Sequence, residues 1–167
     1  MQARELIATL RLAPHPEGGW YREIHRSASS VDAVGGRRAA LTSIYYLLER
    51  AQLSRWHVVD ADEVWHHCAG APLELLAYDP SARRLARQRL CAPDAGGEPA
   101  GGEPAGGEPV GVIAAGIWQA ARSLGEYSLV GCTVAPGFEF TGFRFVSELP
   151  GHARHFVADM EPLRQLL

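Results

Sequence analysis

The sequence contains no lysine and no asparagine, and all 16 of its basic residues are arginine. Without lysine the chain cannot form a Schiff base with pyridoxal phosphate, use a lysine nucleophile or build a phosphate-binding loop around a lysine. Without asparagine it has no site for N-glycosylation. No apolar run approaches the roughly 20 residues that cross a bilayer, so we expect no membrane partner.

Charge and cysteine content narrow the partners further. The 167 residues carry 16 basic and 19 acidic side chains, and the arginines are scattered except for one cluster at Arg83, Arg84, Arg87 and Arg89. A solvated strand face accounts for that cluster, so we expect no nucleic-acid partner. The three cysteines form no Cys-x-x-Cys pair, and the N-terminus does not resemble a signal peptide. Both features favour reduced thiols and a cytoplasmic location.

Short apolar segments dominate the chain. Residues Met1 to Leu12 carry apolar side chains at helical spacing until Pro14, which predicts a short leading helix. From Gly18 the character changes to runs rich in β-branched and aromatic residues, separated by Gly, Pro and Asp. We expect strands at residues 20–26, 41–48, 53–59, 64–68, 73–78, 84–90, 127–134 and 138–146. This spacing predicts an all-β sandwich or barrel.

The length predicts a single domain over residues 1–167. Residues 95–109 are three tandem copies of Ala-Gly-Gly-Glu-Pro, a composition that predicts a flexible, negatively charged surface loop. Residues 150–167 return to mixed polar and apolar character, which suits a closing helix or strand.

The densest group of chemistry-bearing side chains lies in residues 55–70. On an extended strand Glu63, Trp65 and His67 share one face. If the turn at 60–62 folds one strand against the next, His57 faces Glu63 across the pair. Imidazoles and a carboxylate inside a barrel can bind a divalent metal or act as an acid/base pair. A solvated turn with exposed histidines explains the same spacing, so both interpretations stay open.

Five motifs, taken together, resemble a known family. They are His-Pro-Glu-Gly-Gly-Trp-Tyr-Arg-Glu at 15–23, Thr-Ser-Ile-Tyr-Tyr-Leu-Leu at 42–48, Asp-Glu-Val-Trp-His at 62–66, Gly-Ile-Trp-Gln-Ala-Ala-Arg at 116–122, and Tyr-Ser-Leu-Val-Gly-Cys-Thr-Val-Ala-Pro-Gly-Phe at 127–138. In this order they resemble the small cupin-like family whose members open with His-Pro-Glu-Gly-Gly followed by Trp or Tyr. The spacing of Glu63 and Gly70 also resembles half of the first cupin motif.

The resemblance implies a double-stranded β-helix, the cupin jelly roll, paired into a homodimer with a small-molecule pocket in the barrel mouth. It implies no settled activity. Cupin metal sites use a His-x-His pair, then Glu and a later histidine, but this chain has Arg55 at the first position and Trp118 and Gln119 near the last. We therefore expect no metal cofactor. A divalent metal, if one binds, would be held by His57, Glu63 and His67.

The same residues suit metal-free chemistry on a carbonyl compound. His57 can act as a general base oriented by Glu63, and Tyr45 or Tyr127 can supply the acid on the opposite side, although core packing explains either tyrosine equally well. The residues expected to bind ligand are Arg22, Trp65, His67, Trp118, Gln119 and Phe140. The sequence predicts a small-molecule-binding cupin, with isomerase or epimerase chemistry on a carbonyl-bearing sugar or metabolite. A metal-dependent cupin enzyme and a non-catalytic binding or storage module remain alternatives.

Overall fold

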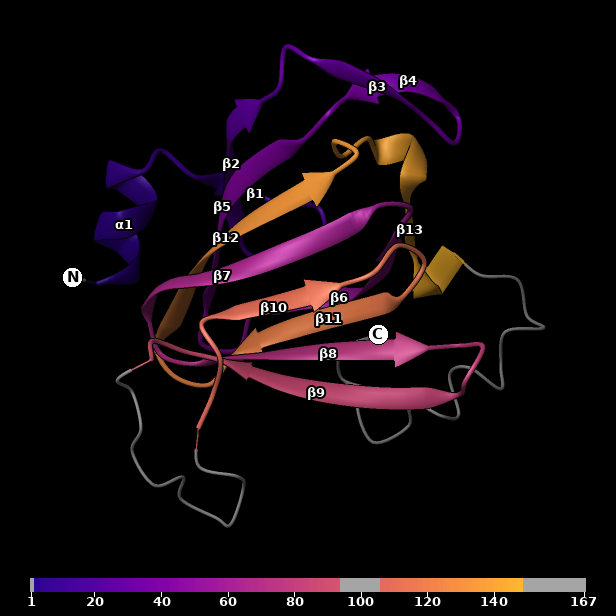
Figure 1. The fold of residues 1–167 in the computed structure, drawn as a ribbon. Coiled ribbons are helices and arrows are strands. Elements are labelled where there is room, and N and C mark those ends of the chain that lie inside the picture. Colours follow the sequence, from indigo (N-terminus) through magenta and orange to yellow (C-terminus); the bar gives the residue numbers. More distant parts are fainter. Residues whose placement is uncertain (1, 94–105, 149–167) are drawn as a thin grey trace.

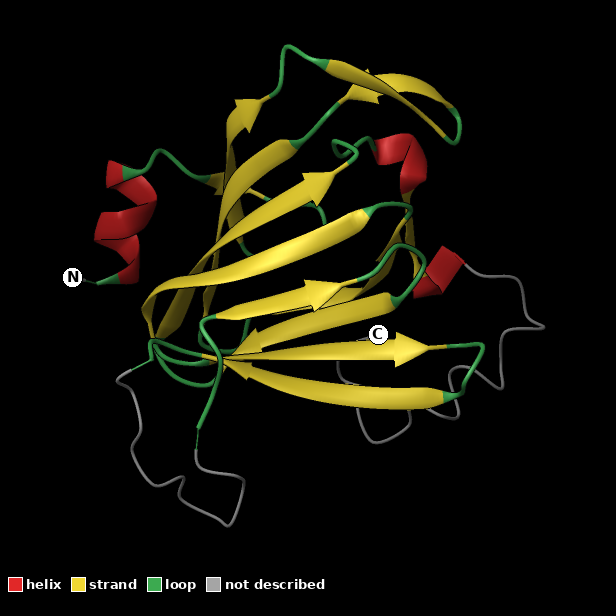
Figure 2. Cartoon of the chain, viewed as in Figure 1, coloured by secondary structure: helices red, strands yellow, loops and turns green. Residues whose placement is uncertain are grey.

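The computed structural model describes residues 2–93 and 106–148. Antiparallel strands make up most of these residues, together with one helix, α1 (Ala3–Thr9), and two 3₁₀ turns, η1 (Phe140–Gly142) and η2 (Val146–Glu148) (Figure 2). The predicted all-β jelly roll with a short N-terminal helix is confirmed. Helix α1 is shorter than predicted, since Arg11 already adopts a positive φ of 53°.

Two sheets form the body of the molecule. The larger has six strands in the order β1 (Ala13–Pro14), β2 (Trp20–Arg26), β5 (Thr42–Glu49), β12 (Tyr127–Ala135), β7 (Asp62–Gly70) and β10 (Val110–Ile113). The smaller has five strands in the order β13 (Phe143–Phe145), β6 (Leu53–Val59), β11 (Trp118–Ser123), β8 (Leu73–Asp79) and β9 (Arg84–Leu90). A separate hairpin joins β3 (Ser30–Ala33) to β4 (Gly36–Ala39). Figure 1 shows α1 at the left of the larger sheet and this hairpin at the upper right.

The main core lies between the two sheets. Tyr46, Trp65 and Val130 of the larger sheet pack there with Leu73 and Leu75 of the smaller. Because side chains alternate along a strand, the neighbours of these residues face outward. Outward-facing Leu47 and Leu129 are covered by Leu6 and Ile7 of α1. Outward-facing Trp56 and Trp118 form a further cluster with Val146 of η2. Both sheets are thus partly covered on their outer faces.

Three local predictions were wrong. Strands β1, β3, β4, β10 and β11 were not predicted, and of the predicted strand at 138–146 only Phe143–Phe145 forms a strand. Strands β6 and β7 do not pair with each other, because the chain crosses between the sheets at residues 60–61. His57 and Glu63 therefore approach each other across the barrel interior and not along a hairpin.

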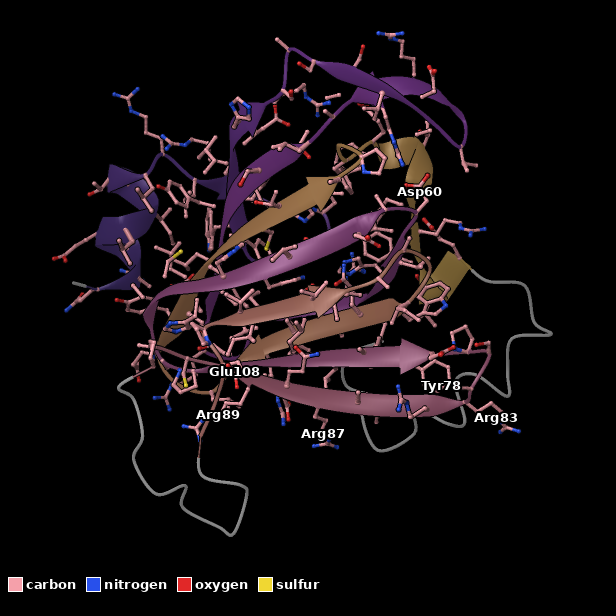
Figure 3. All side chains as sticks on the ribbon, viewed as in Figure 1. Asp60, Tyr78, Arg83, Arg87, Arg89 and Glu108 are labelled. Atoms are coloured by element: carbon pink, nitrogen blue, oxygen red, sulfur yellow. The ribbon has the colours of Figure 1, made fainter. Side chains whose placement is uncertain are left out.

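The last copy of the Ala-Gly-Gly-Glu-Pro repeat is partly held in the fold. Residues 94–105 and 149–167 lie outside the described residues. These ranges include most of the repeat and the whole of the predicted closing segment at 150–167. Glu108, however, accepts a hydrogen bond from Cys91 N at 3.0 Å and donates one to Arg89 O at 3.0 Å (Figure 3). The predicted loop therefore ends before Glu108. No helix in the described part of the chain has the length and hydrophobicity to cross a bilayer.

Candidate functional site

A pocket of about 160 Å³ opens between the two sheets. Its polar wall contains two imidazoles and two carboxyls, those of His15, His57, Glu17 and Glu63. His57, Glu17 and Glu63 are buried, with 2%, 6% and 7% of their surface exposed. The remaining wall is mostly apolar and aromatic. Buried titratable groups that converge on a cavity identify it as the candidate functional site.

The turn between β1 and β2 carries Glu17 into the barrel. His15 N donates to Gly19 O and Gly18 N donates to His15 O, both at 3.0 Å, and Arg55 N of β6 donates to Glu17 O at 3.0 Å. Gly18 has a φ of +113°, and a Cβ at this position would lie 2.0 Å from Leu53 O. Only glycine allows the turn to lie this close to β6.

The Glu17 carboxyl is the centre of a small polar network. Ser54 Oγ donates to Glu17 Oε1 at 3.0 Å. Glu17 Oε2 lies 3.3 Å from His57 Nε2 and 3.7 Å from His15 Nδ1. Burial raises the pKa of Glu17 and lowers the pKa of both His15 and His57. All three groups are therefore pushed towards their uncharged forms.

A β-bulge in β6 explains why both Ser54 and His57 reach Glu17. In the pairing with β11, His57 lies opposite Gln119 and Ser54 lies opposite Ala121, so β6 contains one extra residue. The bulge turns Arg55 outward, where its guanidinium donates to Pro16 O at 2.7 Å. Arg55 is exposed and does not line the pocket, although its positive charge partly offsets the effect of burial on the pKa of Glu17.

Gln119 links His57 to Glu63 from behind the pocket wall. Its amide oxygen accepts a hydrogen bond from Trp65 Nε1 at 3.2 Å, and because an indole can only donate, this contact fixes the orientation of the amide. Gln119 Nε2 then lies 3.0 Å from His57 Nε2 and 2.5 Å from Glu63 Oε2. His57 Nδ1 is 2.7 Å from Arg55 O, which assigns the ring proton to Nδ1 and the lone pair to Nε2.

Glu63 differs from an ordinary carboxyl. Its pKa is raised from 4.5 to about 7, chiefly by burial and also by the nearby Glu17 carboxyl, against the opposing effects of His57 and Gln119. A group with this pKa exchanges its proton near neutral pH. The site therefore holds a neutral imidazole and a carboxyl that is still partly protonated at pH 7.

These residues do not fit a metal ion of the usual cupin kind. The two atoms that a metal would need, His57 Nε2 and Glu63 Oε2, both face the N–H groups of Gln119. His67, the third predicted ligand, lies towards the other end of β7, where its Nε2 is 3.0 Å from Ala71 O. Within residues 2–93 and 106–148 no group of three or more His, Cys, Asp or Glu side chains is arranged to hold a metal.

Phenylalanine rings form the opposite wall of the pocket. Phe138, Phe140 and Phe143 all line it, and the Phe143 ring stacks on His57 with centroids 5.1 Å apart. Phe140 is 56% exposed and stands at the opening. Two tyrosines, Tyr21 and Tyr46, complete the lining beside His15. The pocket can therefore accept a ligand with an apolar or ring-shaped body.

The structure brings together only part of the predicted site. His57, Glu63, Trp65 and Phe140 line the pocket, and Gln119 contacts two of them. The two tyrosines predicted for the site pack in the cluster beneath α1, because strand alternation turns them outward and leaves the inward-facing positions to their neighbours. The predicted residues that lie away from the pocket are Tyr45, Tyr127, Arg22, His67 and Trp118.

Each of these displaced residues has another contact. The Arg22 guanidinium lies 5.7 Å from the centre of the Tyr45 ring on the outer face of the larger sheet, so it is not aimed at a ligand in the barrel. Trp118 is buried in the outer cluster of the smaller sheet. The pocket therefore lacks the arginine that was expected to bind an anionic group.

Two functional candidates, His15 and Glu17, were missed by the sequence analysis. Both belong to the His-Pro-Glu-Gly-Gly motif, which was used only as evidence for the family resemblance. The available signal was the two-residue spacing of a histidine and a glutamate directly before two glycines. Such a pair on a rigid turn is suited to point into a cavity, because the glycines let the backbone approach a neighbouring strand closely.

Comparison with known proteins places the chain among cupins. The family model described as "Cupin superfamily (DUF985)" matches residues 4–146. No curated protein matches the chain. A protein from Shewanella oneidensis is 29% identical with a TM-score of 0.81, covering 100% of this chain and 97% of that chain. A hypothetical protein from Leishmania major is 31% identical with a TM-score of 0.76, covering 99% of this chain and 97% of that chain.

More distant solved structures share the fold alone. Oxalate decarboxylase from Bacillus subtilis is 14% identical with a TM-score of 0.57, and the alignment covers 92% of this chain but 36% of that enzyme. Another structure of that enzyme, also 14% identical to this chain, was determined in a study of the enzyme's Mn(II) centres.

Proposed function

Since the chain belongs to the cupin superfamily (DUF985), we propose that its barrel pocket binds a small carbonyl-bearing sugar or metabolite and transfers a proton on it without a metal. One observation carries the proposal. His57, with a pKa lowered by burial, and Glu63, with a pKa raised to about 7, line the same open pocket. Two groups whose pKa values are shifted in opposite directions are suited to act as base and acid at neutral pH.

The proton-transfer step assigns one role to each group. When substrate binds, the lone pair of His57 Nε2 must leave its hydrogen bond with Gln119 and take the proton from the carbon beside the carbonyl. The protonated Glu63 gives its proton to the carbonyl oxygen, which yields a neutral enol. Glu17 Oε2, 3.3 Å from His57 Nε2, stabilises the imidazolium that forms. The reverse transfer returns a proton to the same carbon or to its neighbour and restores both groups.

The choice between isomerisation and epimerisation depends on a second base. Isomerisation needs one base and one acid, whereas epimerisation needs proton-transferring groups on both faces of the carbon. His15 supplies a second imidazole, because its Nδ1 lies 3.7 Å from the same Glu17 oxygen that contacts His57. The two imidazoles share Glu17, and His15 takes the place that the sequence analysis had given to a tyrosine.

Deuterium incorporation tests this function. The full chain in D₂O, given a panel of aldoses and ketoses of three to six carbons, is expected to label the carbon beside the carbonyl faster than buffer alone. His57→Gln and Glu63→Gln should each slow labelling at least about 100-fold, because each removes a proton-transfer group. The rate should fall as pH rises above about 7, where Glu63 loses its proton, and Glu63→Gln should remove this limb. NMR measures the labelling.

The matched control is Glu126→Gln. Glu126 is an exposed carboxylate paired with Arg50 and does not line the pocket, so this variant loses the same charge and should label at the wild-type rate. A chain that binds a carbonyl compound but labels none of the panel above the buffer rate would refute the proton-transfer assignment. That result would favour the non-catalytic binding module.

Native mass spectrometry with elemental analysis checks two further parts of the proposal, the absence of a metal and a homodimer. On untagged protein prepared without chelator we expect twice the chain mass and less than about 0.1 equivalent of transition metal. Strand β10 supports the dimer, since it forms an edge of the larger sheet within the described residues and its Val110 and Val112 are exposed there. One equivalent of metal that is lost in His57→Ala would contradict the metal-free assignment, and a monomer mass would contradict the dimer.

A further inference from the structure

Acidic side chains outnumber basic ones in the pocket wall. Among the described lining residues there are four carboxyls, Glu17, Glu23, Glu63 and Glu139, and a single guanidinium, that of Arg26. Glu17 and Glu63 lie deep and are buried, whereas Glu23 and Glu139 stand at the exposed rim. A ligand that enters the pocket passes carboxylates at the opening and meets two more at the bottom.

Arg26 does not compensate for these carboxyls. Its Nε and Nη2 donate to the two oxygens of Glu23 at 3.2 and 2.9 Å, and its Nη1 donates to Glu139 at 2.8 Å. Its Nη2 also contacts Phe138 O at 3.4 Å. An anionic ligand would have to displace two carboxylates from this guanidinium, so Arg26 is not a free anion-binding group.

The two deep carboxyls are grouped around one imidazole nitrogen, the Nε2 atom of His57. Both lie beside His57: Glu17 Oε2 is 3.3 Å from its Nε2, and Gln119 Nε2 bridges the same nitrogen to Glu63 Oε2. Their mutual repulsion contributes to the raised pKa of Glu63. An ammonium group carries three N–H donors and no acceptor, so it can bond to both carboxylates and relieve that repulsion.

The aromatic wall accepts the rest of such a ligand. Phe138 and Phe140 meet edge to face with centroids 5.0 Å apart, and Phe143 lies 6.0 and 6.2 Å from them. The faces of aromatic rings carry negative electrostatic potential and attract cations. A pocket of about 160 Å³ is about the size that holds one six-membered ring.

We propose that this pocket selects organic cations, namely primary amines with a compact apolar or ring-shaped body, and discriminates against carboxylates and phosphates of the same shape. The inference rests on the proposed function and narrows it, because the carbonyl compound would then be one that also bears an amine. Glu17 binds the ammonium, and Glu63 becomes the second carboxylate beside it once it has given its proton to the carbonyl oxygen. Phe138, Phe140 and Phe143 enclose the body.

Three probes that share one ring but differ in charge test the selection. Benzylammonium, benzyl alcohol and benzoate are titrated into the full chain by calorimetry at pH 8, where the amine is charged and Glu63 is largely ionised. Benzylammonium should bind about tenfold or more tightly than benzyl alcohol, since a charge-assisted hydrogen bond contributes about that factor, and benzoate should bind more weakly still. Glu17→Gln and Glu63→Gln should each reduce the preference for the amine to below about threefold, while Glu126→Gln should preserve it.

Several results would overturn the selection. Benzoate binding as tightly as benzylammonium, a preference that survives in both pocket variants, or no binding of any probe would each do so. Stoichiometric Zn²⁺ binding that excludes benzylammonium would assign the carboxyls to a metal instead. Deuterium labelling of neutral sugars by a chain without preference for the amine would overturn only the charge selection and leave the proposed function standing. Tight amine binding without labelling of any carbonyl compound would overturn the proposed proton transfer and leave the charge selection standing.

Discussion

The free energy of unfolding of Glu63→Gln, relative to that of the wild type, is expected to be higher at pH 8 than at pH 4.5. The expected difference between the two pH values is about 3 kcal/mol. The folded pKa of Glu63, about 7, lies above the ordinary value of 4.5 because the carboxyl is buried. Its protonated form therefore contributes stability below pH 4.5, and that contribution is lost as the pH rises through 7. A shift of about 2.5 pKa units corresponds to about 3 kcal/mol. Glutamine stays neutral and can still accept the hydrogen bond from Gln119.

Urea unfolding at several pH values between 4.5 and 8 measures this difference. His15, whose pKa is lowered, loses stability as the pH falls below 6.5 in both proteins, so its contribution cancels in the comparison. The Glu63 charge raises the pKa of His57, so its removal lowers that pKa further and adds to the difference between the two proteins. Glu126→Gln should differ from the wild type by less than about 0.5 kcal/mol throughout. A difference between Glu63→Gln and the wild type that does not change with pH would show that Glu63 ionises normally in the folded protein.

Gly18→Ala should destabilise the protein by about 2 to 4 kcal/mol. The new Cβ would lie 2.0 Å from Leu53 O, and the φ of +113° would strain any residue with a side chain. The turn must then move away from β6, which also pulls Glu17 away from Ser54 and His57. The hydrogen bond from Tyr46 to Gly18 O, 2.8 Å long, is lost in the same movement. Urea unfolding at pH 7 gives the change in free energy.

Gly35→Ala separates the cost of backbone strain from the cost of the clash with Leu53. Gly35 also has a positive φ, +90°, but nothing lies within 4 Å of the position of a new Cβ. This variant should cost only the backbone strain, about 1 to 2 kcal/mol. Equal costs for the two variants would mean that the turn at Gly18 is not pressed against Leu53 and that its glycine is needed for its conformation alone.

The strands that could be predicted are those whose sequences carry the usual β signals. Residues 20–26 follow Gly19, residues 53–59 precede Asp60 and residues 84–90 follow the Asp-Pro pair at 79–80, and the structure has strands with the same bounds as these three runs. Strand β11, with two alanines and a glutamine, lacks those signals and is extended because it is paired on both sides, by β6 and β8. The phenylalanine-rich segment at 138–146 was predicted as a strand, but only Phe143–Phe145 forms one, and Phe138, Phe140 and Phe143 line the pocket.

The candidate site was predictable in kind but not in arrangement. Strand alternation and the cupin resemblance indicated His57 and Glu63, yet which of Tyr45 and Tyr46 faces the pocket depends on the register between sheets. The outward turn of Arg55 depends on a bulge in β6 that no local residue signals. Glu17 reaches His57 only because the first turn folds back on β6, a contact between segments about 40 residues apart.

The fixed orientation of Gln119 also controls where a proton on His57 can go. Trp65 occupies the only amide oxygen, so Gln119 presents nothing but hydrogen to Nε2 of the imidazole. A protonated Nε2 would meet this hydrogen head-on, and within the described surroundings the nearest oxygen able to receive its proton is that of Glu17. His57 is therefore expected to pass a proton on to Glu17 and not to stay protonated. Gln119, the side chain that enforces this, does not line the pocket.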